Sequence, residues 1–283
     1  MPRQKKFNKI CKDIKSIKIQ GAENIAKAAF FAYKLVPTPA SKKKLLSLRP
    51  TEPMLQNILD LADNMPYIEL KIKLDKNQEL INHHVFNLIK NNSIIFTHCH
   101  SSTVTHALIY AKKHGKKFEV YNTETRPLFQ GRKTFNELNQ AGIKVTMFAD
   151  SAVKIALTKD QDKEEKTKPV NIIFLGADAI TNKGVINKVG SGMISDIAKQ
   201  NHIPLYIIAD SLKYASKPIK FEQRNPKEIL NKLNILKNSK NKKTKSSIKD
   251  PAFEFIEKKN ITQIISELGV LGYKKFLKKI KNI

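Results

Sequence analysis

Short apolar runs that are rich in β-branched residues recur along the last two-thirds of the chain, and helical periodicity fills the intervals between them. The runs lie at 93–97, 118–122, 144–149, 170–175 and 205–209. Regular alternation of strand and helix is typical of a parallel sheet that carries helices on both faces. The pattern therefore predicts an α/β fold with a Rossmann-like parallel sheet.

The first part of the chain has helical periodicity only. It extends over residues 7–87, and four prolines divide it into separate helices: Pro37, Pro39, Pro50 and Pro53. We predict a small helical domain at 1–91, followed by a Rossmann-like α/β domain at 92–283 that holds the catalytic site. An extended piece at 250–255, a short strand at 261–266 and a basic helix at 271–280 would complete that domain.

Each apolar run ends in polar or reactive side chains. Cys99 follows the first run and Asp178 the fourth, while Asp150 and Lys213 follow two of the others. The carboxyl ends of parallel strands meet at one edge of the sheet, where such folds bind their ligands. We therefore expect a thiol, carboxylates and cations to gather in one crevice.

Cys99 has three possible roles: a small buried hydrophobe, a metal ligand together with His98 and His100, or a functional thiol. Strand alternation would direct both histidines away from the thiol, and the sequence holds no second Cys/His cluster, which disfavours a metal. The helix expected at 104–112 is preceded by three hydroxyl residues, Ser101, Ser102 and Thr103. Hydroxyls and amides at a helix amino terminus favour phosphate, so the pattern favours a functional thiol beside an anion site.

Asp178 ends a wholly apolar strand, where burial would raise its pKa and suit a general acid. A helix cap or a salt bridge with a lysine is the plainer interpretation of this residue alone. Residues 185–192 combine Lys188 with two glycines ahead of a helix, a second pattern suited to phosphate. No GxGxxG or Walker A spacing occurs, so we predict no nucleotide cofactor and no metal.

The segment 123–132 carries Glu124, Arg126 and Arg132, and we expect a carboxylate–guanidinium pair that shapes the rim of the crevice. Asp150 precedes another helical stretch, and capping of that helix is its expected role.

The net charge of +27 is compatible with an anionic substrate or with nucleic acid. Most lysines are scattered singly, and the densest run, at 237–249, has the composition of a solvated loop. Tryptophan is absent and basic residues do not alternate with aromatic ones, so a specific nucleic-acid partner is disfavoured. Cys11 and Cys99 are too far apart and too different in context to suggest a disulfide. Without a long apolar segment or a signal core, the expected location is the cytoplasm, with no membrane partner.

Several motifs, ordered along almost the whole chain, resemble one superfamily. They are Ile19-Gln20-Gly21-Ala22, Arg49-Pro50-Thr51, Thr97-His98-Cys99-His100-Ser101, Glu124-Thr125-Arg126-Pro127, Gly176-Ala177-Asp178-Ala179-Ile180, Ile186-Asn187-Lys188-Val189-Gly190, Lys213-Tyr214 and Asp250-Pro251-Ala252-Phe253-Glu254. The chain is similar to archaeal-type ribose-1,5-bisphosphate isomerases, methylthioribose-1-phosphate isomerases and the regulatory subunits of translation initiation factor 2B. The isomerases keep a catalytic cysteine and aspartate that the regulatory subunits generally lack, and Cys99 and Asp178 match them.

The resemblance implies an isomerase that converts ribose 1,5-bisphosphate to ribulose 1,5-bisphosphate in nucleoside monophosphate (AMP) salvage, without cofactor or metal. After ring opening, Cys99 would accept the C2 proton through a cis-enediol, and Asp178 would shuttle protons at the oxygens. A dry, cationic site would bring the thiol pKa toward working pH. The implied substrate contacts are Gln20, Gly21, Ala22, Glu23, Arg49, Ser101, Ser102, Thr103, Asn187, Lys188 and Lys213. The resemblance also implies a homo-oligomer, a hexamer built from dimers, and activation by AMP.

Two alternatives accompany this interpretation. The context of Cys99 resembles the ribose-1,5-bisphosphate enzymes more than the methylthioribose ones, but both substrates are phosphorylated riboses. A non-catalytic regulatory subunit is the alternative from another class, and the retention of Cys99 and Asp178 argues against it. Gln20 stands where the isomerases usually carry arginine, and the helical domain is shorter than is usual in the family.

Overall fold

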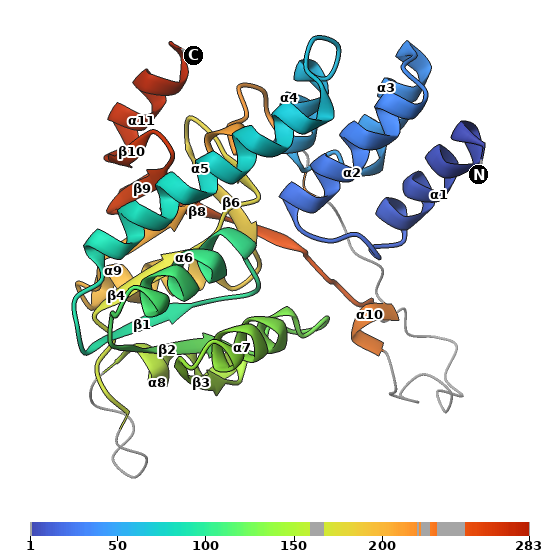
Figure 1. Cartoon of the computed structure of the whole chain (residues 1–283). Coiled ribbons are helices and arrows are strands. Elements are labelled where there is room, and N and C mark those ends of the chain that lie inside the picture. The colour runs from blue at the N-terminus through green and yellow to red at the C-terminus, as the bar shows by residue number, and fades with distance from the viewer. Residues whose placement is uncertain (1, 159–166, 220, 222–226, 231–246, 283) are drawn as a thin grey trace, which may run out of the picture.

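A computed structural model of the chain describes residues 2–158, 167–219, 221, 227–230 and 247–282 (Figure 1). The helices are α1 Arg3–Lys15, α2 Ala22–Leu35, α3 Pro39–Leu48, α4 Pro53–Leu61, α5 Tyr67–Leu88, α6 Ser102–Lys113, α7 Gln130–Gln140, α8 Val153–Leu157, α9 Ser191–Gln200, α10 Lys227–Leu230 and α11 Tyr273–Ile280. The strands are β1 Ser93–Thr97, β2 Phe118–Thr123, β3 Lys144–Phe148, β4 Ile172–Leu175, β5 Ala179–Ile180, β6 Gly184–Lys188, β7 Leu205–Ile208, β8 Phe253–Glu257, β9 Gln263–Ser266 and β10 Gly269–Leu271. Among the described residues, no helix is both long and apolar enough to cross a membrane. Most of the lysine-rich run at 237–249 lies outside the described residues.

The main sheet has seven strands in the order β10-β9-β7-β4-β1-β2-β3. All neighbours are parallel except β10, which pairs antiparallel with β9. The predicted α/β class and its mostly parallel sheet are therefore confirmed. The antiparallel sheet β5-β6-β8 was not predicted. Its strand β6 coincides with residues that the sequence suggested only as a glycine-containing approach to a helix.

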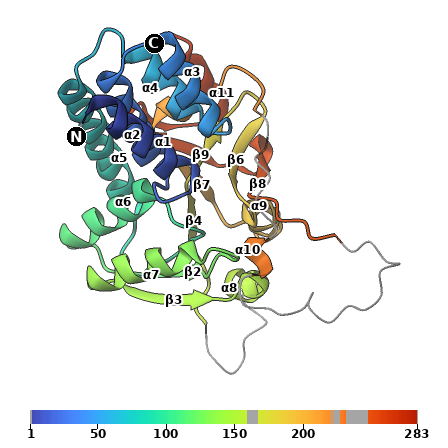
Figure 2. The ribbon, with the colours of Figure 1, turned by 90° about the vertical axis from the view of Figure 1, so that its right-hand side faces the viewer.

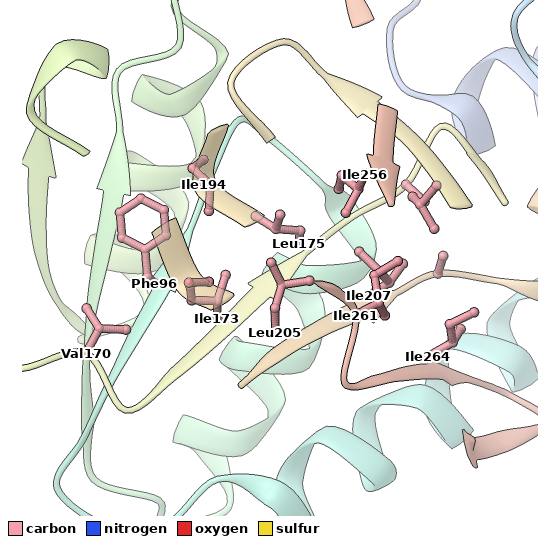
Figure 3. Close-up of a cluster of buried hydrophobic side chains, with 14 of the residues drawn as sticks. Phe96, Val170, Ile173, Leu175, Ile194, Leu205, Ile207, Ile256, Ile261 and Ile264 are labelled. Carbon is pink, nitrogen blue, oxygen red and sulfur yellow. The ribbon is translucent and has the colours of Figure 1, made fainter. Parts of the chain in front are cut away.

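Strand alternation sends apolar side chains to both faces of the main sheet. Ile95 packs with Val104 of α6 and Val85 of α5 on one face. Phe96, the next residue, packs on the other face with Ile173 and with residues of α8, α9 and α11. Figure 3 shows the second cluster, in which Leu175, Leu205 and Ile256 lie among the labelled side chains. Figure 2 shows α5, α6 and α7 on one side of the sheet and α8 and α9 on the other.

The amino-terminal helices have their own core, formed by buried side chains from α1 to α5 that include Phe7, Phe30 and Leu55. Prolines stand at the starts of α3 and α4, where they cost no helical hydrogen bond, which confirms their predicted role as breaks. The helix α5 contributes Leu70 and Leu74 to this core and Ile81 and Val85 to the sheet domain. Figure 1 shows it running from the amino-terminal helices to the face of the sheet that α6 covers. The division at residue 91 stays a prediction, and α5 is the element that joins the two cores.

Polar contacts also tie the helical part to the carboxyl ends of the strands. Asn57 Nδ2 of α4 donates to the carbonyls of Leu212 and Tyr214 at 2.7 and 2.9 Å. Asn77 Nδ2 of α5 donates to Asp210 Oδ2 at 2.8 Å just beyond β7. The edge of the sheet that is expected to bind ligand therefore faces the amino-terminal helices.

Two glycines let backbone segments approach closely at this edge. A Cβ at Gly131 would lie 1.7 Å from the carbonyl oxygen of Thr123, and a Cβ at Gly176 would lie 2.7 Å from Ser101 Oγ. The second contact lets the side chain of Ser101, at the start of α6, lie against the backbone that follows β4. The first explains how α7 begins directly against the end of β2, since no side chain fits between them.

Replacement of Gly131 by alanine should destabilise the protein by more than about 3 kcal/mol, because a backbone oxygen cannot move out of the way cheaply. Urea unfolding followed by circular dichroism measures the loss. Gly272→Ala is the matched control, since Gly272 has φ −61° and open space around its Cβ position. It should change stability by less than about 0.5 kcal/mol. Equal effects of the two substitutions would contradict the packing described for α7.

Candidate active site

A cavity of about 310 Å³ opens between the amino-terminal helices and the carboxyl ends of β1, β2, β4, β6 and β7. Cys99 and Asp178 both line it, as the predicted crevice requires. The predicted binding residues that also line it are Gln20, Gly21, Ala22, Glu23, Arg49, Ser101, Ser102, Asn187, Lys188 and Lys213. Thr103 does not line it: it is the second residue of α6, and it is buried. The structure thus gathers all but one of the predicted site residues around one cavity.

Cys99 has a left-handed backbone, with φ 65°, two residues beyond the end of β1. Its N–H donates to Thr125 Oγ1 at 3.1 Å, and its carbonyl oxygen accepts from Thr134 Oγ1 at 2.8 Å. A non-glycine residue costs energy in this conformation and keeps it only where its surroundings fix it. The strand ends at Thr97, so the alternation argument for the two histidines does not apply to this turn.

His98 extends this polar network to β6. Its Nε2 lies 2.8 Å from the carbonyl oxygen of Val189, which can only accept, so Nε2 carries the proton. Burial lowers the pKa of His98, and the neutral ring accepts at Nδ1 from Thr123 Oγ1. Thr123 Oγ1 lies 3.3 Å from Thr125 Oγ1, the acceptor for the Cys99 N–H. A continuous hydrogen-bonded chain therefore runs from Cys99 to the strand end that carries Lys188.

The thiol of Cys99 is less acidic than the sequence suggested. Desolvation by the surrounding protein raises its pKa to about 12, and Asp178 and Asp150 add to the rise. The backbone N–H of His100 and the charge of Lys188 act in the opposite direction but are weaker. The expectation of a pKa near working pH is therefore wrong. Cations are present at the site, but the desolvation of the thiol outweighs their effect on its pKa.

Three of the cations that line the cavity were predicted from the sequence, and each comes from a different element. Arg49 follows α3 and pairs with Glu52 at 3.2 Å, with both side chains almost fully buried. Lys213 follows β7, and its Nζ donates to the carbonyl oxygen of Ala177 at 2.7 Å. Lys188 ends β6 and is 5% exposed, and within the part of the chain that the structure describes its ammonium has neither a hydrogen bond nor an ion pair. Such a buried cation is well suited to bind a phosphate.

The two helix amino termini proposed as phosphate sites differ. At α6, Ser101 Oγ accepts from the N–H of Val104, and Ser101 and Ser102 face the cavity. At α9, a carboxylate oxygen of Glu254 already accepts from the N–H of Gly192. Only Asn187 and Lys188 of the stretch 185–192 line the cavity. The prediction of an anion site at the start of α9 is therefore wrong, because the protein's own carboxylate satisfies this terminus.

Asp178 leaves the end of β4 and enters the small sheet, where its N–H donates to the carbonyl oxygen of Ile186 at 2.9 Å. Its side chain is half-buried, more open than expected at the end of an apolar strand. The small sheet thus fixes the backbone of Asp178 next to the strand that carries Asn187 and Lys188.

At the rim, Glu124 pairs with Arg132, which confirms the predicted carboxylate–guanidinium pair. Arg132 and Arg126 both lie over the ring of Phe129, at 4.0 and 4.7 Å from its centroid. Asp150 does not cap the following helix. Its carboxylate accepts from the N–H groups of Thr125 and Arg126 at 2.9 and 2.7 Å, so it holds the loop that contacts Cys99.

Sequence reasoning missed several residues at the cavity. His100, Lys133 and Phe129 line it, and so does Gln130, whose buried Oε1 has no hydrogen-bond partner. Gln130 was visible in the sequence beside Gly131, but nothing local signals that its side chain points to the thiol's cavity. In the described part of the chain, no three His, Cys, Asp or Glu side chains group as metal ligands do.

The fold and the cavity define an α/β enzyme whose thiol and carboxylate face a cation-lined pocket. Residues 41–272 match the initiation factor 2 subunit family, and the chain belongs to that family. It is 32% identical to the ribose 1,5-bisphosphate isomerase of Methanocaldococcus jannaschii, over 91% of this chain and 89% of that protein. The methylthioribose-1-phosphate isomerase of Exiguobacterium sibiricum is 28% identical, over 92% of this chain and 84% of its own length. Within its family, this chain is an isomerase, as predicted.

Solved structures agree on the fold. The Pyrococcus horikoshii translation initiation factor eIF-2B superposes with a TM-score of 0.76 at 22% identity, covering 94% of this chain and 96% of that one. The 5-methylthioribose 1-phosphate isomerase of the same organism gives 0.71 at 21% identity, covering 98% and 87%. At this level of identity the likeness concerns the fold alone.

The Cys99 thiol should remain protonated until far above neutral pH, since its pKa is raised to about 12. Thiolate absorbance near 240 nm, compared between the native protein and Cys99→Ser, measures this titration. The raised pKa also stabilises the fold at pH values below the unfolded thiol's pKa of roughly 8.5. That stabilisation is lost as pH rises from there toward 12. A Cys99 titration near pH 7 would contradict the dominance of desolvation.

Proposed function

We propose that this protein is an aldose–ketose isomerase that converts ribose 1,5-bisphosphate to ribulose 1,5-bisphosphate. One observation carries the proposal: Cys99 and Asp178 line a single cavity together with Arg49, Lys188 and Lys213. Two phosphates need several positive groups, and these three cations come from separate elements. The ribose 1,5-bisphosphate isomerases of M. jannaschii and Thermococcus kodakarensis, 32% and 28% identical over most of this chain, add support.

The reaction needs four proton movements. The ring oxygen O4 and carbon C1 each gain a proton, while C2 and the hydroxyl on C2 each lose one. We assign the carbon-bound proton to Cys99, which takes it from C2 and returns it to C1. Asp178 protonates O4 as the ring opens and later takes the proton of the C2 hydroxyl. Because O1 carries a phosphate, the intermediate is the 1-phosphate of the cis-enediol, and both groups end in their starting states.

The high pKa of Cys99 has a kinetic consequence under this assignment. At pH 7 only about one molecule in 10⁵ carries the thiolate when the pKa is about 12. The fraction rises about tenfold with each pH unit. The proposal therefore includes an increase of kcat/KM as the pH rises above 7.

Methylthioribose 1-phosphate is the second candidate substrate. It has one phosphate and an apolar methylthio group, and apolar side chains of Ile17, Leu128, Phe129 and Phe253 also line the cavity. The relative in E. sibiricum carries that name. The wider proposal places the enzyme in the cytoplasm, where it acts in nucleoside monophosphate salvage. It also makes the enzyme a hexamer built from dimers that AMP activates.

A substrate panel tests the proposal. Purified protein is incubated with ribose 1,5-bisphosphate or with methylthioribose 1-phosphate, with and without AMP, and the ketose product is quantified. We expect kcat/KM for the bisphosphate to exceed that for the monophosphate by at least tenfold. The reverse preference would assign the protein to the second substrate, and no turnover of either would overturn the proposal.

Replacement of either reacting group should abolish most of the activity. Cys99→Ser and Asp178→Asn should each lower kcat by about 10²–10⁴, the usual contribution of a positioned acid or base. Cys11→Ala is the control, because Cys11 is buried in the amino-terminal core and does not line the cavity. Cys11→Ala should keep near-native kcat, and a near-native kcat in either site variant would refute its assigned role.

A further inference from the structure

The hydrogen bonds of His100 determine which of its nitrogens is protonated. Its Nδ1 lies 3.1 Å from Thr134 Oγ1, and the same hydroxyl donates to the carbonyl oxygen of Cys99 at 2.8 Å. A hydroxyl has a single proton, and a carbonyl can only accept. Thr134 therefore has to accept from His100, which places the imidazole proton on Nδ1.

The second nitrogen of this ring is left with a lone pair. Burial lowers the pKa of His100 to about 4, with a further contribution from Lys133 and partial opposition from Glu137. The ring is neutral at pH 7, so Nε2 carries no proton. Over residues 2–158 and the other described ranges, Nε2 makes no hydrogen bond, although His100 lines the cavity next to Cys99.

The other histidine beside Cys99 is different. Both nitrogens of His98 are used, Nε2 as donor to Val189 and Nδ1 as acceptor from Thr123. His98 therefore has no nitrogen left for a ligand, and its contribution is to hold the turn. The two histidines have opposite tautomers, and only His100 keeps a free acceptor.

Acceptors matter in this cavity because its cations can only donate. An open-chain sugar phosphate brings hydroxyl groups that lose their water on binding, and each hydroxyl needs an acceptor for its proton. Asp178 lines the cavity and can serve some of them. His100 Nε2 is the acceptor adjacent in sequence to the thiol.

We infer that His100 Nε2 accepts a hydrogen bond from a hydroxyl group of the bound sugar phosphate and so orients it beside Cys99. His100 is then a further substrate-binding residue. The identity of the sugar rests on the proposed function, but the position of the acceptor does not.

Two amide substitutions separate this role from simple support of the Cys99 turn. In His100→Asn the amide N–H can replace Nδ1–H and keep the bond to Thr134, but nothing replaces Nε2. In His100→Gln the longer amide can replace Nε2. We expect kcat/KM to fall about 10- to 100-fold in His100→Asn and to stay within about fivefold of native in His100→Gln. Native kcat/KM in His100→Asn, or a loss confined to His100→Gln, would overturn the inference.

A measurement without turnover keeps the inference testable if no substrate in the panel reacts. Nitrogen-15 NMR of the labelled native protein, with His100 assigned by comparison with His100→Asn, reports the tautomer directly. We expect the Nδ1–H form, with the Nε2 resonance moving upfield on addition of ribose 5-phosphate but not of inorganic phosphate. An Nε2–H tautomer, or an Nε2 resonance unchanged by ribose 5-phosphate, would overturn the inference whatever the enzyme's substrate.

Discussion

The turn at Cys99 depends on two threonine hydroxyls that form hydrogen bonds with its backbone N–H and carbonyl groups. Thr125 accepts from the N–H, and Thr134 donates to the carbonyl. These two hydrogen bonds hold a left-handed conformation that a cysteine does not adopt by preference, and the turn leads the chain from β1 into α6 with the thiol at the cavity. Other residues of the site hold the two threonines and the turn in place. Asp150 holds the loop of Thr125, Gly131 lets α7 bring Thr134 into reach, and His98 ties the network to β6.

The electrostatics of the cavity follow from competition between burial and charge. A cation can lower a thiol pKa, but two of the three predicted cations already interact with protein groups, Arg49 with Glu52 and Lys213 with the carbonyl of Ala177. Lys188 is the cation whose effect on Cys99 opposes desolvation, and it is too weak to prevail. The Cys99 thiol is therefore neutral at pH 7, and the positive charge of the site is available to bind phosphates. A phosphate dianion beside Lys188 would reduce that lysine's effect on the thiol still further.

Sequence patterns located the strand-end residues because the geometry of a parallel sheet follows from alternation alone. Cys99, Asp178 and Lys213 meet at one edge for that reason, whereas Lys188 reaches the cavity from β6 of the small antiparallel sheet. Thr134 and His100 could not be assigned in this way, because their contact depends on how α7 packs against β2 through Gly131, and no local sequence pattern indicates that packing. The prediction of an anion site at the start of α9 failed for a related reason. Its glycines and lysine fit an anion site in sequence, but Glu254 arrives from β8, about sixty residues later, and fills it. Strand β6 was missed because its partner β8 is equally distant.

The amino-terminal helices and the sheet domain both contribute side chains to the cavity, so a bound substrate would contact both parts of the chain. Gln20, Glu23 and Arg49 come from the amino-terminal helices, whereas the thiol and carboxylate come from the sheet. The two parts are joined by α5, whose apolar residues belong to both cores, and by the amides of Asn57 and Asn77. A ligand that bridges Arg49 and Lys188 would replace mutual repulsion of cations by attraction to shared phosphates. Its binding energy would therefore tighten the contact between the helices and the sheet edge, and such closing of the site would expel water from beside Cys99.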